Sequence, residues 1–136
     1  MIDPGYCVTM ARYNRWQSGW MMPAVSALGE AERRRDRGAF FGSIQNTLSH
    51  LLWGDGVWMA RFDGGPSPEA PLENSTTAYD DWDELSAGRT AMDSRILHWA
   101  ETLEPADLAG ELSWYSGATK SEKRKPKALC VMQLFN

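Results

Sequence analysis

The stretch that decides the fold is residues 40–63, which read FFGSIQNTLSHLLWGDGVWMARFD. At about 100° per residue, most of its large apolar side chains gather on one side of a helix. They are Phe41, Ile44, Leu48, Leu51, Leu52, Met59 and Phe62, with Asp55 among them. Trp53 and Val57 lie roughly opposite Leu48. This helix is therefore apolar on more than one side, as the inner helix of a bundle would be.

Two more helices are predicted from apolar side chains that recur every three, four or seven residues. The first covers residues 6–35, and its internal Pro23 should bend it. The second covers residues 82–104, and its stripe includes one charged residue, Arg89. A last, short and very apolar helix is expected to begin near Pro126.

The segments between the helices have few large apolar side chains. Glycine and proline follow Asp63, so we expect a long surface loop from there to Asp81. Residues 112–115 alternate imperfectly and predict a short strand or hairpin arm. The basic run over residues 120–127 is interpreted as a solvated loop. The pattern predicts an all-α four-helix bundle, one domain over residues 1–136, with a small extended insertion before a last helix that is cut short.

Composition and charge narrow the class of function. The chain has 136 residues, of which 43% are hydrophobic, enough for one buried core. Residues 63–111 carry 12 acidic and 2 basic side chains, which would repel phosphate backbones, so nucleic acid is not an expected partner. No run reaches the roughly 18–20 apolar residues of a membrane helix, and no signal peptide is visible. Two cysteines without Cys-x-x-Cys spacing favour a reduced, cytoplasmic protein.

The chain lacks the familiar catalytic sequence signatures, and its two histidines limit the remaining choices. His98 lies away from the apolar stripe of its helix, so we expect it in solvent. His50 shares a partly apolar face with Asn46, Trp53 and Val57. A histidine at this position is interpreted either as a metal ligand in a groove between helices or as an ordinary half-buried histidine.

Three motifs resemble the DinB family of metalloenzymes over nearly the whole chain. They are Tyr13-Asn14-Arg15-Trp16, the run Thr47-Leu48-Ser49-His50-Leu51-Leu52-Trp53-Gly54-Asp55 and the terminal Leu134-Phe135-Asn136. The resemblance implies a four-helix bundle with unusual connectivity. It also implies a divalent transition metal, nickel or zinc, held by three histidines. His50 would be the first of them. The other two belong four residues apart on the last helix, where both can grip one ion.

This chain departs from the family pattern at the last helix. Position 133 is a glutamine, and the sequence ends at Asn136, so we expect two of the three histidine ligands to be absent. The resemblance implies a metal-dependent enzyme, such as a thiol-dependent transferase or isomerase. In that enzyme His50 would bind the metal, and Asn46, Trp53 and Trp58 would line the cofactor pocket.

The alternative is a non-catalytic helical bundle that acts by dimerisation or by binding a small apolar ligand. Seven tryptophans offer the contact area for either role. A short last helix leaves inner faces of the other helices uncovered, and a homodimer would cover them. We therefore expect a homodimer, with a small molecule or a thiol as the other candidate partner.

Overall fold

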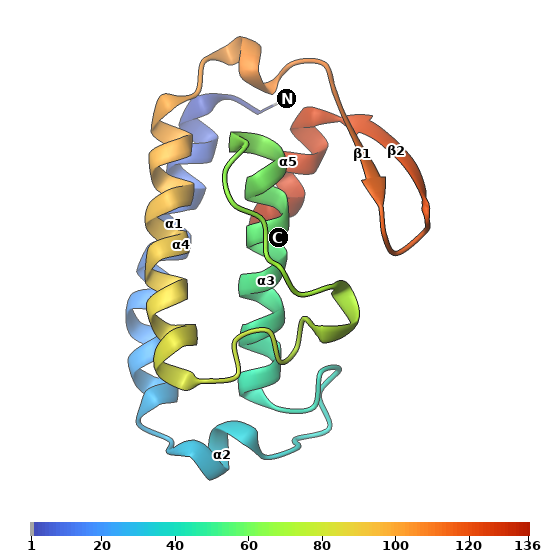
Figure 1. The fold of residues 1–136 in the computed structure, drawn as a ribbon. Coiled ribbons are helices and arrows are strands. Elements are labelled where there is room, and N and C mark those ends of the chain that lie inside the picture. Colours follow the sequence, from blue (N-terminus) through green and yellow to red (C-terminus); the bar gives the residue numbers. More distant parts are fainter. Residues whose placement is uncertain (1) are drawn as a thin grey trace.

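The computed structural model describes residues 2–136, and three long helices run along its length (Figure 1). They are α1 (Pro4–Ser26), α3 (Ile44–Asp63) and α4 (Trp82–Thr102). Each is preceded by a polar side chain, Asp3, Ser43 or Asp81. That side chain accepts a hydrogen bond from the backbone N–H three residues on, at 2.7, 3.0 and 2.9 Å. Such N-caps satisfy a backbone donor that the first turn leaves free, which stabilises each helix by about 1 kcal/mol.

The prediction of one continuous helix over residues 6–35 is wrong. The chain breaks after Ser26 and resumes as the five-residue α2 (Glu30–Arg34). Gly29 has a φ of +79°, a conformation that favours glycine, and it turns the chain there. Pro23 lies inside α1 without ending it, at an exposed position where the missing N–H costs one hydrogen bond.

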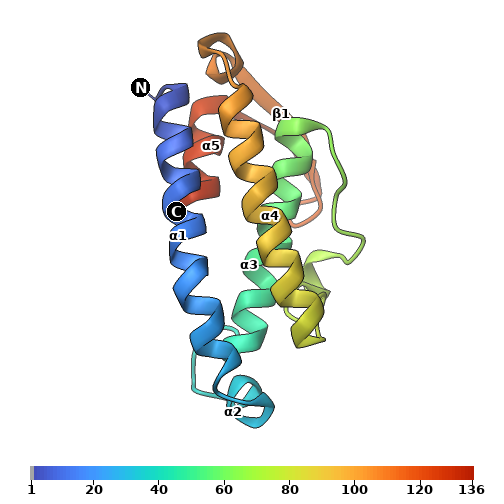
Figure 2. The same cartoon turned by 90° about the vertical axis from the view of Figure 1, so that its left-hand side faces the viewer.

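The helices pack as neighbours in a fixed order. α1 lies beside α4 over most of its length, and α3 lies on the other side of α4 (Figures 1 and 2). The last helix, α5 (Lys127–Phe135), contacts α1 at the end of the molecule where α1 begins and α4 finishes. Because α5 has only nine residues, it covers only part of the length of α1 and α3.

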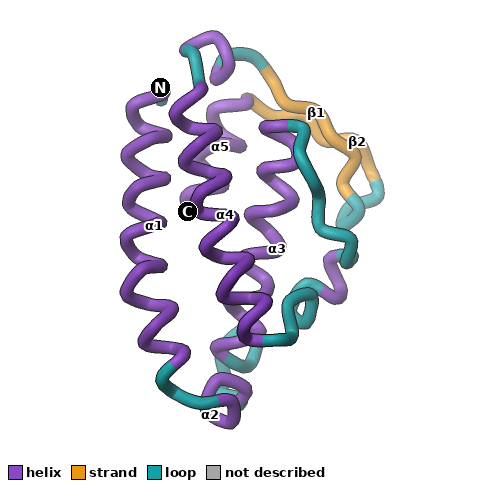
Figure 3. Tube along the Cα trace, turned by 60° about the vertical axis from the view of Figure 1, so that its left-hand side comes forward, coloured by secondary structure: helices purple, strands orange, loops and turns teal. Residues whose placement is uncertain are grey.

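A two-stranded hairpin precedes α5, after the short 3₁₀ helix η2 (Pro105–Leu108) (Figure 3). Strand β1 (Glu111–Ser116) pairs antiparallel with β2 (Ser121–Pro126). The predicted strand at residues 112–115 is thus confirmed as part of β1. The basic run after it is not a solvated loop, because most of it forms β2. Alternate side chains of β1 are half-buried, which gives the hairpin one face toward the helices.

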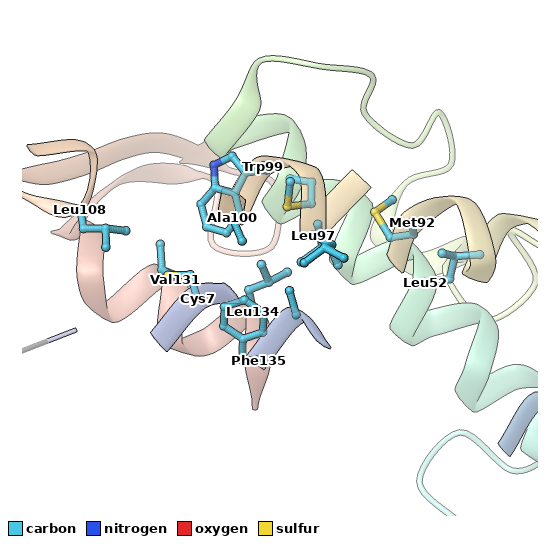
Figure 4. Packing of buried hydrophobic residues seen from close by; sticks show 13 residues of the cluster. Cys7, Leu52, Met92, Leu97, Trp99, Ala100, Leu108, Val131, Leu134 and Phe135 are labelled. Atoms are coloured by element: carbon cyan, nitrogen blue, oxygen red, sulfur yellow. The ribbon is translucent and has the colours of Figure 1, made fainter. Parts of the chain in front are cut away.

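The main hydrophobic core lies between α1, α4 and α5, with α3 closing one side (Figure 4). Its most buried members are Cys7 and Ala11 of α1, Leu52 and Met59 of α3, Ile96 and Ala100 of α4, and Val131 of α5. A smaller cluster of Met22, Leu48 and Leu85 lies toward the opposite end. The molecule thus has a thick core beside α5 and a thin one away from it.

The mostly helical fold expected from the sequence is confirmed, together with the small extended insertion before the last helix. In the described part of the chain, no helix combines the length and the apolar character that a membrane crossing requires.

Candidate functional site

His50 lies on the face of α3 that is covered by loops. Its Nδ1 is 2.8 Å from the hydroxyl oxygen of Ser75, which is buried. Its ring lies 4.1 Å, centroid to centroid, from the ring of Phe41, and 6.0 Å from that of Trp53, with which it is stacked. Its contacts outside α3 come from the segments before and after that helix, Phe41 and Ser75, and not from another long helix.

The loop over residues 64–81 is held against α3 by side chains of the helix. Ser49 donates to the carbonyl of Ser75 at 2.9 Å and accepts from the N–H of Tyr79 at 3.1 Å. Trp53 Nε1 donates to the carbonyl of Ala70 at 2.8 Å. Gly56 has no side chain, and a Cβ there would lie 2.8 Å from Pro68. The loop therefore lies directly on the helix surface and fixes the surroundings of His50.

The three residues expected to line a cofactor pocket do not lie together. Asn46 and Trp53 flank His50, and Asn46 donates its amide to the carbonyl of Phe41 at 3.2 Å. Trp58 is eight residues farther along α3, about 12 Å at 1.5 Å per residue. It contacts Phe62 and the hairpin instead. The structure thus brings together His50, Asn46 and Trp53 and leaves Trp58 at a separate place.

The described residues do not by themselves fit a three-ligand metal site. Between residues 2 and 136, no three His, Cys, Asp or Glu side chains lie close enough to hold one ion. His98 is exposed on α4, as expected from the sequence. Cys7 and Cys130 are free, buried thiols. Burial, with help from Asp3, raises the pKa of Cys7 to about 11, so its thiol stays protonated at neutral pH.

A buried ion-pair cluster joins α3 to α4, and sequence reasoning missed it. Arg89 lies between Asp55 and Asp93, with nitrogen–oxygen distances of 2.7 and 2.8 Å. Two carboxylates face one guanidinium, so the cluster carries an excess negative charge. Burial raises the pKa of Asp55 against the opposing effect of Arg89, and Asp93 raises it further. The sequence does contain a signal for this cluster. The apolar stripe of residues 40–63 includes one acidic residue, Asp55, and the apolar stripe of residues 82–104 includes one basic residue, Arg89.

This cluster lies in a groove of about 230 Å³ that begins where α5 ends. We call it the α1–α3 groove. Its wall residues come from four helices and are Asn14, Gln17, Ser18, Met21, Leu48, Leu51, Asp55, Arg89, Asp93, Leu134, Phe135 and Asn136. The groove therefore lies between α1 and α3, next to the described end of α5.

A row of exposed aromatic side chains runs along α1 beside this groove. Tyr13, Trp16 and Trp20 are 48%, 64% and 57% exposed, and each stacks on or edges against the next. Gln17, which lines the groove, donates to the hydroxyl of Tyr13 at 3.2 Å. The aromatic row and the groove thus form one continuous surface.

The fold and site define a mostly helical domain with an antiparallel hairpin ahead of its last helix and a histidine held beneath a long loop. A sequence model of the DinB family matches residues 1–130, and the chain belongs to the DinB family. This confirms the family resemblance, and the first two of the three motifs lie within the matched residues. No curated protein and no solved structure matches the chain.

Proposed function

We propose that this DinB-family domain acts by self-association, with a second copy covering the α1–α3 groove. The observation that carries the proposal is the aromatic row of α1. Three large aromatic side chains contact one another at the surface, and each forgoes the free energy that its burial would release. Exposed Trp and Tyr of this kind are typical of interface centres. Leu51, on the opposite lip of the groove, is also exposed.

The arrangement of apolar side chains supports a second copy as the occupant. The aromatic row lies on α1 beside the groove, and exposed Leu51 of α3 borders the groove on its other side. In a two-fold contact the same patch meets itself, so each copy's aromatic row can pack against the other's groove. In that contact α1 of the second copy packs along α1 and α3 of the first, as neighbouring helices do in a bundle.

Light scattering during size-exclusion chromatography tests the proposal. At about 100 μM the expected mass is twice 15.3 kDa. Trp16→Ala and Trp20→Ala should each raise the dimer dissociation constant roughly 30-fold or more, as central interface residues do. Leu51→Asp should abolish the dimer, whereas Leu72→Asp, a similarly exposed leucine on the loop, should not. A monomer mass for the unaltered chain at this concentration would contradict the proposal.

A metal-dependent enzyme, such as a thiol-dependent transferase or isomerase, is the second candidate, and one contact favours it. Metal-bound histidines usually hold their other ring nitrogen by a hydrogen bond to a fixed partner. His50 Nδ1 has such a partner in buried Ser75, and with the proton on Nδ1 its Nε2 is left as a potential ligand. Asn46 and Trp53 flank that histidine. A nickel or zinc site there needs ligands that residues 2–136 do not gather.

Calorimetric titration with nickel and zinc separates the two candidates. We expect the chain to bind either ion more weakly than about 1 μM, since one imidazole lacks the advantage of several ligands on rigid helices. Sub-micromolar binding that His50→Ala removes, and that the control His98→Ala retains, would favour the metal-dependent enzyme instead. Two free, buried cysteines support the cytoplasmic location that we propose for either function.

A further inference from the structure

A cavity of about 410 Å³ opens where the hairpin meets α3 and α5. Its walls are Trp58 of α3, Trp114 and Lys125 of the hairpin, and Leu129, Cys130 and Gln133 of α5. We call it the tryptophan pocket. It shares no wall residue with the α1–α3 groove, so its occupancy is independent of self-association.

Two indole rings form a rigid corner in this pocket. The rings of Trp58 and Trp114 lie 5.5 Å apart, centroid to centroid, at an interplanar angle of 70°. Trp58 is fixed from behind by stacking on Phe62, which in turn stacks on Trp99 of the core. A flat apolar ring can lie on one indole with its edge toward the other, an arrangement that aromatic groups favour.

Two cations that pair with no carboxylate among the described residues lie at this pocket: Lys125 belongs to its wall, and Arg61, which is not a wall residue, lies against the two indoles that line it. The Arg61 guanidinium lies over both indoles, 4.8 Å from the Trp58 ring and 4.9 Å from the Trp114 ring. Neither Arg61 nor Lys125 forms an ion pair within the described part of the chain. Burial lowers the pKa of Arg61, because its guanidinium has lost contact with water and no carboxylate is paired with it.

We propose that the tryptophan pocket binds a small, flat carboxylate, its apolar ring against Trp58 and Trp114 and its carboxylate toward Arg61 and Lys125. The planar guanidinium matches a carboxylate through two parallel hydrogen bonds. The Gln133 amide, in the wall that α5 forms, can bond a further polar substituent of the ligand. Burial raises the pKa of Cys130, so its thiol stays protonated, and the ligand binds without a covalent step.

Isothermal titration with 2-naphthoate tests this assignment, and naphthalene-2-carboxamide is the neutral ligand of nearly the same shape. We expect the carboxylate to bind with a dissociation constant below about 1 mM and the carboxamide at least about tenfold more weakly. Lys125→Gln, at an exposed strand position that folding does not depend on, should weaken naphthoate binding about tenfold. Arg61→Lys keeps the charge but loses the two-pronged geometry, and should weaken binding less than Arg61→Gln.

Arg124→Gln is the matched control, because it removes one positive charge from the neighbouring position of the same strand, on the other face of the hairpin. It should leave naphthoate binding unchanged, as should Leu51→Asp in the groove. Equal binding of the carboxylate and the carboxamide would overturn the proposal. So would a loss with Arg124→Gln as large as that with Lys125→Gln, or no naphthoate binding at millimolar concentration.

Discussion

The two ends of the helix bundle differ in what fills the space between α1 and α3. Beside α5 that space is an apolar core in which Cys7, Ile96 and Val131 are almost completely buried. Beyond α5 it is an open groove over the charged cluster of Asp55 and Arg89. The same three long helices border both regions.

The side chains that α4 turns toward its neighbours are apolar beside α5 and include a charged residue at the groove. Ile96 and Ala100 face the end that α5 closes, and Arg89, two turns before Ile96, faces the groove. A helix that met only apolar neighbours would gain nothing from a guanidinium, whose burial is costly without partners. The difference indicates that α4 meets two environments, an apolar one beside α5 and a charged one in the groove.

The largest effect that tests this comparison is expected from Arg89→Met. It leaves Asp55 and Asp93 close together without a cation, and breaking a buried pair in this way costs about 3–5 kcal/mol. Urea denaturation followed by circular dichroism measures the loss in the free energy of unfolding. Arg95→Met, at the more open pair with Asp63, is the control and should cost less. An equal cost at both positions would show that the groove cluster is not specially buried.

The second largest difference in the free energy of unfolding is expected between substitutions that remove a buried side chain at the two ends of the bundle. Ile96→Ala, in the closed end, should cost about 2–4 kcal/mol, because a tightly surrounded side chain leaves a cavity. Leu48→Ala should cost less, roughly 1–2 kcal/mol, since Leu48 borders the open groove and its loss makes no closed cavity. Thermal and denaturant unfolding of both variants measures the difference. Equal losses would remove the distinction between a thick and a thin core.

Two aspartates of α3 should give stability profiles of opposite slope against pH. Burial raises the pKa of Asp55, so its contribution is present below the unfolded value near 3.8 and is lost as pH rises through the folded value. The Arg95 guanidinium, which bonds both oxygens of Asp63, lowers the pKa of that carboxyl. Its contribution is present above 3.8 and is lost as pH falls through the folded value.

Asp55→Asn and Asp63→Asn compare these profiles directly. The destabilisation by Asp63→Asn should grow as pH rises toward and past the unfolded value, and that by Asp55→Asn should shrink as pH rises above it. Denaturant midpoints measured across the acidic range give both slopes. If the destabilisation by the two variants changed with pH in the same direction, the folded state would shift the pKa values of Asp55 and Asp63 in the same direction.

The smallest effect on stability is expected from the aromatic row. Trp16→Ala should change the free energy of unfolding of the monomer by no more than about 0.5 kcal/mol, because the side chain is mostly exposed. Denaturation at low protein concentration, where association is negligible, measures it. A loss above 1.5 kcal/mol would give Trp16 a structural role and weaken the case for an interface.

The helices could be predicted from the sequence because apolar spacing and capping residues are local signals. Ser43 and Asp81 stand where α3 and α4 begin, and the stripes behind them have the helical period. The end of α1 was predicted wrongly because both Pro23 and Gly29 can interrupt a helix, and the sequence alone does not show which of them does. A proline in an exposed helix position loses one bond, whereas a positive φ redirects the whole chain.

The candidate site could be predicted only in part. His50 was correctly assigned to a face away from the main stripe, beside Asn46 and Trp53. What covers that face is a loop bound largely through its backbone, and backbone carbonyls leave no pattern in a sequence. Asp55 and Arg89 were visible as charges within apolar stripes, but their pairing depends on how α3 lies against α4, which spacing within one helix does not fix.

The attachment of the loop over residues 64–81 has a consequence for how this segment can vary. Ser49, Trp53 and Gln45 of α3 bond backbone groups of the loop, and any amino acid supplies those groups. Most side chains of the loop are thus free to change without detaching it, and mutational tolerance should be high across the segment. Three positions are exceptions: the Ser75 hydroxyl meets His50, the Tyr79 ring packs against both core clusters, and the Asp81 carboxylate caps α4. A deep mutational scan should therefore show intolerance at Ser75, Tyr79 and Asp81 within an otherwise permissive loop.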